Sequence, residues 1–114
     1  MSANLDTLLK LIDSPRDGAL LRYSIGNEYL KQGDPTNASL HLREALRRDP
    51  KFSAAWKLLG KTLAETGRGQ EAIDTYREGI AVAESRGDLQ AAKEMKVYLR
   101  RLEKQPPNAD KSTP

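Results

Sequence analysis

The stretch WKLLGKTLAETGRGQEAIDTY, residues 56–76, has a counterpart in RYSIGNEYLKQGDPTNASLHL, residues 22–42, which lies 34 positions earlier. The identical pairs at this offset are Gly26/Gly60, Gly33/Gly67, Ala38/Ala72, Arg43/Arg77 and Glu44/Glu78. The conservative pairs are Ile25/Leu59, Leu42/Tyr76 and Leu46/Ile80. A fixed period of this length is typical of a repeat protein, in which each repeat is one supersecondary unit that stacks on the next.

The small residues in this register predict close approaches between antiparallel helices. Gly60 with Ala72, like Gly26 with Ala38, lets two helices come near each other, because a bulkier side chain would push the pair apart. Leu42 and Tyr76 are then expected to fill the space beside each approach.

Helix-breaking residues and apolar spacing divide the chain into six expected helices. The expected ranges are a leading helix at 4–13, then 17–32, 35–48, 53–66, about 69–85, and a closing helix at 88–104 capped by Asp88. With 114 residues the chain is long enough for one domain, which we place at 1–104. Residues 105–114 are polar and rich in proline, so we expect a disordered tail.

Composition argues against an enzyme. The chain has no cysteine and one histidine, His41, which we expect on a helix surface without a partner. No residues are grouped as a metal site, a nucleophile with its base, or a phosphate-binding loop, so we assign no catalytic, metal or cofactor-binding residues. We expect no cofactor and no small-molecule substrate.

The N-terminal leucines do not form a targeting signal, because Asp6, Lys10 and Asp13 interrupt them. No stretch approaches the roughly 20 apolar residues of a membrane span. We therefore expect a cytoplasmic protein without membrane contact.

The second copy has the pattern Trp56-x2-Leu59-Gly60-x2-Leu63 followed by Ala72-x3-Tyr76, which resembles the tetratricopeptide repeat (TPR) family. The resemblance implies an all-α array of two helical hairpins, at 19–52 and 53–86, with the closing helix as a C-terminal cap. It is similar to the small bacterial two-repeat proteins of that family. Trp56 is expected in the core, and Arg22 stands where the first copy would carry the equivalent tryptophan.

The resemblance also implies a non-enzymatic interaction module or adaptor, which binds a protein or peptide in a concave groove lined by the first helix of each hairpin. The groove residues expected from this placement are Tyr23, Asn27, Leu30, Lys57 and Lys61. The lysines favour an acidic partner. The clamp with which some members of the family grip chaperone C-termini is not expected, because only Asn27 matches its pattern.

Two alternatives remain at this point. The formal net charge of +3 is set by residues 86–104, which hold six basic and three acidic side chains. Nucleic-acid or acidic-surface binding would use the basic residues of the closing helix, Lys93, Lys96, Arg100, Arg101 and Lys104, although Tyr98 is the only aromatic residue among them. Self-association through an uncovered outer helix is the other alternative, and the oligomeric state stays open.

Overall fold

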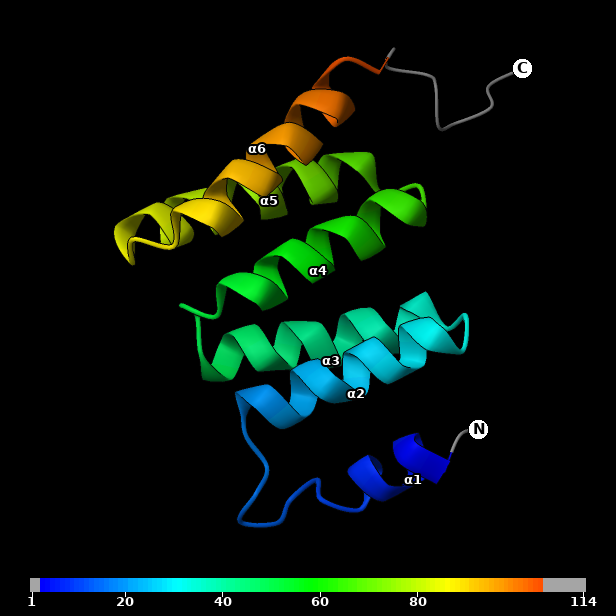
Figure 1. Cartoon of the computed structure of the whole chain (residues 1–114). Helices are drawn as coiled ribbons and strands as arrows, with labels where there is room; N and C mark the ends of the chain where they lie inside the picture. Colours follow the sequence, from blue (N-terminus) through cyan, green and yellow to red (C-terminus); the bar gives the residue numbers. More distant parts are fainter. Residues whose placement is uncertain (1–2, 106–114) are drawn as a thin grey trace, which may run out of the picture.

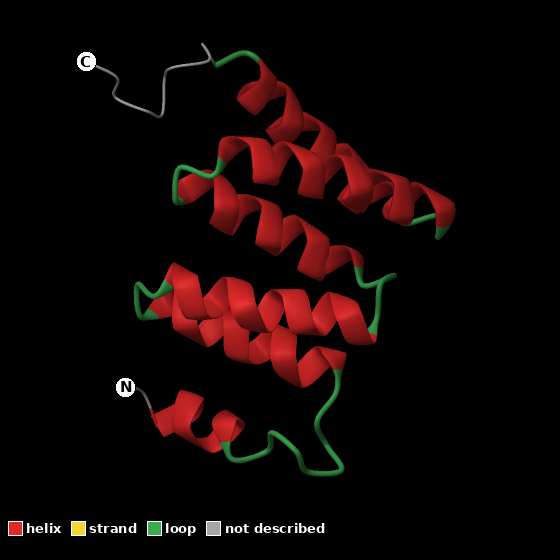
Figure 2. Cartoon of the chain, turned by 180° about the vertical axis from the view of Figure 1, so that it is seen from behind, coloured by secondary structure: helices red, strands yellow, loops and turns green. Residues whose placement is uncertain are grey.

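The computed structural model describes residues 3–105, and this part of the chain is entirely helical and turn structure. The α-helices are α1 (Ala3–Leu9), α2 (Ala19–Lys31), α3 (Pro35–Arg48), α4 (Ser53–Glu65), α5 (Gly69–Ser85) and α6 (Leu89–Glu103). They stack in chain order, with α1 and α6 at opposite ends of the stack (Figure 1), and only short turns and one longer loop join them (Figure 2). The predicted all-α repeat array is confirmed.

The same backbone turn closes three of the helices. Gly33, Gly67 and Gly87 have positive φ angles of 73°, 77° and 78°, which glycine adopts without steric cost. In each turn the next residue donates its N–H to a carbonyl in the last turn of the helix; these bonds are Asp34 N to Tyr29 O, Arg68 N to Leu63 O and Asp88 N to Ala83 O. The predicted cap is confirmed, since the Asp88 carboxylate accepts the Ala91 N–H at 3.3 Å.

The predicted bounds of the leading helix were wrong at its end. The helix α1 stops at Leu9, and residues 10–13 continue as turns before Asp13 enters the left-handed region at φ 67°. A non-glycine residue in that conformation cannot continue a right-handed helix. The other predicted helices agree within two residues at each end, and α5 with 17 residues is longer than α3 with 14, as expected. The predicted disordered tail lies outside the described residues, apart from Gln105.

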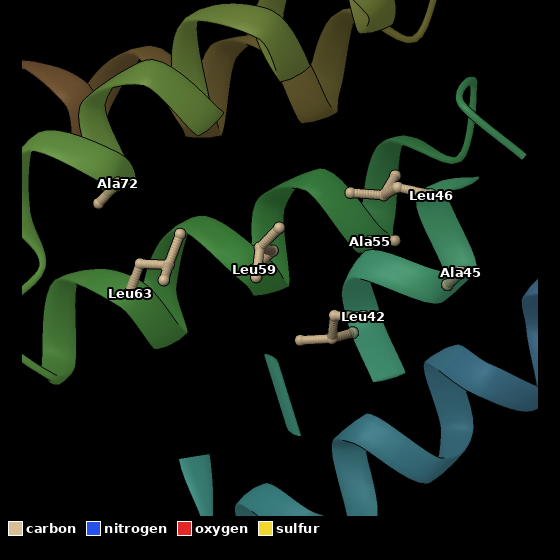
Figure 3. Close-up of a cluster of buried hydrophobic side chains, with 7 residues drawn as sticks. All are labelled: Leu42, Ala45, Leu46, Ala55, Leu59, Leu63 and Ala72. Carbon is tan, nitrogen blue, oxygen red and sulfur yellow. The ribbon is translucent and has the colours of Figure 1, made fainter. Parts of the chain in front are cut away.

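Apolar side chains from neighbouring helices form the core as three clusters. The central cluster joins α3, α4 and the start of α5, with its side chains lying between the helices (Figure 3). Its buried members are Leu42, Ala45, Leu46, Ala55, Leu59, Leu63 and Ala72. A second cluster lies between α5 and α6, and a third joins α1 to α2. Because burial is shared between successive helices, no hairpin has a core of its own.

The predicted close approaches at Gly26 and Gly60 are confirmed. A Cβ atom at Gly26 would lie 2.9 Å from Leu42 Cγ, and one at Gly60 would lie 2.7 Å from Tyr76 Cδ1. Both distances are shorter than ordinary carbon contacts of about 3.5–4.0 Å. Leu42 and Tyr76, which the 34-residue offset pairs in the sequence, therefore make equivalent contacts with the glycines of their hairpins.

Trp56 and His41 are placed differently from what the sequence predicted. Trp56 packs against both the central cluster and the α5–α6 cluster but stays partly exposed, and its Nε1 donates to the Pro50 carbonyl at 2.7 Å. The prediction that His41 is a surface residue without a partner was wrong. It is half-buried and its ring stacks on Tyr29 with centroids 5.6 Å apart. Burial lowers the pKa of His41, so the imidazole is uncharged near neutral pH.

A polar network closes the outer end of the first hairpin. The Asp17 carboxylate is 4% exposed and accepts hydrogen bonds from Arg22 Nε at 2.8 Å and Nη2 at 3.0 Å. It also accepts the Asp13 N–H at 2.9 Å, and Arg48 donates to the Asp17 carbonyl at 3.0 Å. Arg22, which replaces a tryptophan in the repeat pattern, thus pairs with a carboxylate where the second hairpin uses an aromatic ring.

Candidate functional site

A hollow of about 320 Å³ lies between the C-terminal halves of α4 and α6. It is lined by Lys61, Ala64, Glu65, Tyr76, Tyr98, Arg101 and Leu102. The turn at Gly87 sends α6 back along α5, and α6 also contacts α4 directly. Three helices that are separate in sequence therefore build one surface feature.

The floor of the hollow is largely aromatic and aliphatic. Tyr76 is 1% exposed, and its ring centroid lies 5.8 Å from that of Tyr98. Leu102 is partly buried and packs against the central cluster and the α5–α6 cluster. Burial raises the pKa of Tyr76, so its phenol stays neutral and the floor carries no charge at physiological pH.

Two cations stand around the ring of Tyr98 at the rim of the hollow. Lys61 Nζ lies 5.8 Å from the ring centroid, and the guanidinium carbon of Arg101 lies 6.0 Å from it. Each contact is within the range of a cation–π interaction, worth roughly 0.5–1 kcal/mol at an exposed site. Within residues 3–105, neither Lys61 nor Arg101 has a carboxylate at ion-pair distance. The rim therefore presents two cations that form no ion pair within this part of the chain, although the carboxylate of Glu65 lines the same hollow.

Lys57, predicted to share the groove with Lys61, is already paired. Its Nζ lies 2.5 Å from Glu94 Oε1, so it connects α4 to α6. The hydrogen bond to Glu94 raises the pKa of Lys57 and lowers that of Glu94, so both groups stay charged near neutral pH. Of the two predicted groove lysines, only Lys61 offers an uncompensated charge to a partner.

The residues predicted on α2 are arranged along that helix at different distances from the hollow. Tyr23 packs on Phe52 with ring centroids 4.9 Å apart, and it lies near enough to Lys57 to contribute to the raised pKa of that lysine. Asn27 and Leu30 are half-buried on the same helix and do not line the hollow. The structure thus connects Lys57 to α6 through Glu94, whereas none of the three predicted residues of α2 lines the hollow.

Of the five basic residues predicted as an alternative site on α6, four share one exposed face at steps of three and four residues, and Arg101 is set apart from them. Lys93, Arg100 and Lys104 are exposed, and Lys96 Nζ pairs with Glu84 Oε2 of α5 at 2.6 Å. Arg101 lines the hollow instead. The two sites predicted from the sequence therefore meet, because Arg101 of the basic helix and Lys61 of the groove contact the same tyrosine ring.

Sequence reasoning missed Tyr98 and Leu102 as members of this site. A partial signal was available on α6. Arg101 and Leu102 lie three and four residues after Tyr98, so the three side chains are on one face of the helix. The same spacing separates Lys61 from Glu65 on α4. Nothing in either spacing indicated that these two faces lie opposite each other.

Between residues 3 and 105, no three histidine, aspartate or glutamate side chains are placed to hold a metal ion. None of the helices there is both long and apolar enough to cross a bilayer.

Comparison with known proteins identifies the architecture. The family model of the tetratricopeptide repeat matches residues 23–88. A TPR repeat-containing protein of Pseudomonas aeruginosa is 42% identical over 100 residues, which cover 88% of this chain and 95% of that protein.

Two solved structures are similar over most of their length. The solution structure of a protein from Bordetella parapertussis has a TM-score of 0.77 at 42% identity, and the alignment covers 90% of this chain and 89% of the other. The solution structure of a tetratricopeptide repeat domain protein from Salinibacter ruber has a TM-score of 0.75 at 29% identity, covering 82% and 94%. The family match, the relative and the two structures agree with the period and the stack described above, and the chain belongs to the tetratricopeptide repeat family.

Proposed function

We propose that this chain is a non-enzymatic interaction domain that binds a segment of a partner protein on the face formed by α2, α4 and α6. Tetratricopeptide repeat domains are in general protein–protein interaction modules. In this chain the proposed binding face runs from Tyr23 on α2, past Lys61 on α4, to Tyr98 and Arg101 on α6.

The observation that carries the proposal is the charge at the rim of the hollow. Elsewhere on the stack, some exposed arginines have carboxylate partners, as Arg43 has in Glu71 at 3.0 Å and Arg77 in Glu103 at 2.8 Å. The exposed Arg16, Arg86 and Arg100 have no carboxylate at ion-pair distance among the described residues, but they do not line the hollow. Lys61 and Arg101 instead stand beside an aromatic floor with no such partner among the described residues. A surface that keeps cations uncompensated next to apolar groups is suited to an external ligand with complementary charge.

The size of the hollow favours a protein partner over a small molecule. At about 320 Å³ the hollow is at the lower end of the roughly 300–1,000 Å³ that small-molecule sites occupy. It can receive a side chain or two, so most of the contact area has to come from the surrounding helices. Tyr23, Asn27 and Leu30 on α2 would supply the remainder of the binding surface, as the sequence predicted.

The test is affinity capture from the native cell with three forms of the immobilised domain. The wild type is compared with Lys61→Glu/Arg101→Glu and with the matched control Lys93→Glu/Arg100→Glu, which makes the same charge change on the exposed side of α6. We expect one partner protein to be retained by the wild type and the control and to be lost from the first variant. Thermal melting of all three forms verifies that the stack is intact.

The same experiment separates the alternatives. Loss of the partner from the Lys93→Glu/Arg100→Glu control alone would place binding on the exposed side of α6 and contradict the proposal. A nucleic acid in that fraction, released steeply by salt, would identify phosphate binding as the activity. Retention of a second copy of the chain, again independent of Lys61 and Arg101, would identify self-association.

A further inference from the structure

We infer that the hollow between α4 and α6 receives the side-chain carboxylate of a single aspartate or glutamate in a partner segment, together with an apolar side chain next to it. This inference rests on the proposed function and specifies the chemistry of the same site.

Both cations lie near the same aromatic ring. Lys61 Nζ and the Arg101 guanidinium lie 5.8 Å and 6.0 Å from the ring centroid of Tyr98, and they come from different helices. Two like charges that share one ring and have no carboxylate partner repel each other. A carboxylate placed near both removes that repulsion and accepts charge-assisted hydrogen bonds, which are stronger than those between neutral groups.

The apolar floor of the hollow favours a ligand that carries an apolar side chain next to its carboxylate. Tyr98, Leu102 and Ala64 present ring and aliphatic surface inside the hollow, over the buried ring of Tyr76. Covering this surface with an apolar side chain removes it from water, which is favourable in proportion to its area. An acidic residue with an aliphatic or aromatic neighbour therefore matches the hollow better than an isolated carboxylate does.

The rim also limits how many negative charges a ligand can bring into the hollow. Glu65 lines the same hollow as the two cations, and it has no ion-pair partner among the described residues. A second acidic group on the ligand would meet its negative charge, so the site suits one carboxylate and disfavours acidic runs and phosphodiester backbones. We assign the carboxylate to a side chain within the segment, and a probe with a free C-terminal carboxylate tests the other source.

The experiment titrates the intact protein with three pentapeptides and follows its amide resonances. The first probe is acetyl-Gly-Leu-Glu-Leu-Gly-amide, and the second replaces glutamate by glutamine. The third is the glutamine peptide with a free C-terminal carboxylate. We expect the first probe to shift the amides around Lys61, Tyr98 and Arg101 with millimolar affinity, and the other two to bind about three- to fivefold more weakly, as for one exposed charge pair worth up to about 1 kcal/mol.

Point variants sharpen the test, and one of them predicts a gain. Lys61→Gln and Arg101→Gln should each weaken the first probe about three- to fivefold, whereas the controls Lys93→Gln and Arg100→Gln leave it unchanged. Glu65→Gln should tighten binding about two- to threefold, since a like charge is removed. A gain in affinity cannot arise from a damaged fold, so this variant is decisive even if another one is unstable.

Several results would overturn the inference. These are equal binding of the glutamate and glutamine probes, stronger binding of the probe with a free C-terminus, and no gain from Glu65→Gln. The proposed function would survive these results if a captured partner still depended on Tyr23 and Asn27 of α2. If capture depended on no residue of the α2, α4 and α6 face, the proposed function itself would fall.

Discussion

The two helical hairpins of this chain have their close helix crossings at equivalent positions of the repeat, but different side chains pack beside these crossings. In the first hairpin, Gly26 of α2 approaches Leu42 of α3, and in the second, Gly60 of α4 approaches Tyr76 of α5. The aliphatic side chain in one and the aromatic ring in the other occupy equivalent places. A repeat therefore requires a close crossing at its glycine, whereas the side chain beside the glycine can vary.

The outer ends of the two hairpins differ even more. The first is closed by the ion pair of Arg22 with Asp17 and by the short helix α1. The second is closed by a full helix, α6, whose Ala92 and Met95 are 3% and 0% exposed against α5. The first end thus combines an ion pair with the apolar contacts of Leu5 on Leu21 and Ile25, whereas the second depends on the apolar face of a full helix, and each means of closure can be tested by its removal.

Removing the apolar closure should have the largest effect. A chain of residues 1–87 lacks α6, which leaves the buried side chains Tyr76, Ile80 and Ala83 of α5 exposed to water. We expect loss of cooperative thermal unfolding and aggregation, because a short array needs its terminal cap. Circular dichroism and size-exclusion chromatography measure both. A soluble fragment that melts like the full chain would show that α6 does not close the stack.

Removing the polar closure should cost less, about 3 kcal/mol, as for a buried ion pair that loses one partner. The change is Asp17→Asn, and urea unfolding near neutral pH gives the free energy difference. Arg22 is 13% and Asp17 4% exposed, so little solvent is available to replace the lost contact. The exposed Asp6→Asn in α1 is the control.

The effect of Asp17→Asn should also depend on pH. The hydrogen bonds from Arg22 and then from the Asp13 N–H lower the pKa of Asp17 below its usual 3.8. A carboxyl group whose pKa is depressed by folding stabilises the native state fully above the unfolded value and loses that contribution as the pH falls through the folded value. Wild type and variant should therefore differ near neutral pH and converge below pH 3.8. A difference that is constant with pH would contradict the ion pair.

The smallest effects should come from the two glycines and should differ between the hairpins. Alanine at either site gains up to about 1 kcal/mol of helix propensity but introduces a short contact. At Gly60 the contact is with the buried ring of Tyr76, so Gly60→Ala should cost a net amount of about 1–3 kcal/mol. At Gly26 the nearest atoms belong to the more adaptable Leu42, so Gly26→Ala should cost less than about 1 kcal/mol.

A compensating change tests the comparison directly. Tyr76→Leu gives the second hairpin the residue that the first has in Leu42, so the penalty of Gly60→Ala should shrink toward that of Gly26→Ala when measured in this background. Urea unfolding of the single and double variants measures the coupling. Equal penalties at Gly26 and Gly60 in the wild-type background would show that the side chain beside the glycine does not matter.

The sequence predicted the fold because its signals are local or periodic. Helix ends follow from Gly33, Gly67 and Asp88, and the close crossings follow from an offset of 34 residues that can be counted directly. The end of α1 was missed because Asp13 carries no signal for its positive φ, which the hydrogen bond from its N–H to Asp17 accompanies.

The candidate site was less predictable because it depends on contacts between helices. The pattern assigned Lys57 and Lys61 the same role, but Glu94, 37 residues away from Lys57, pairs with only one of them. It also grouped Arg101 with the other basic residues of α6, although Arg101 lies beside Tyr98 on that helix, and the packing of α6 on α4 brings Lys61 to the same ring. Packing angles follow from how side chains interlock, which a single repeat period does not specify.

The order of the helices in the stack has a consequence for synthesis. Nearly every helix packs against the one that follows it in the chain, so most contacts are local and folding should be fast. During translation the first hairpin can form as soon as α3 is complete, and the second can dock on it. The hollow is an exception, because Tyr98, Arg101 and Leu102 are supplied by the last helix. A nascent chain should therefore acquire its fold gradually but its binding site only when synthesis is nearly finished.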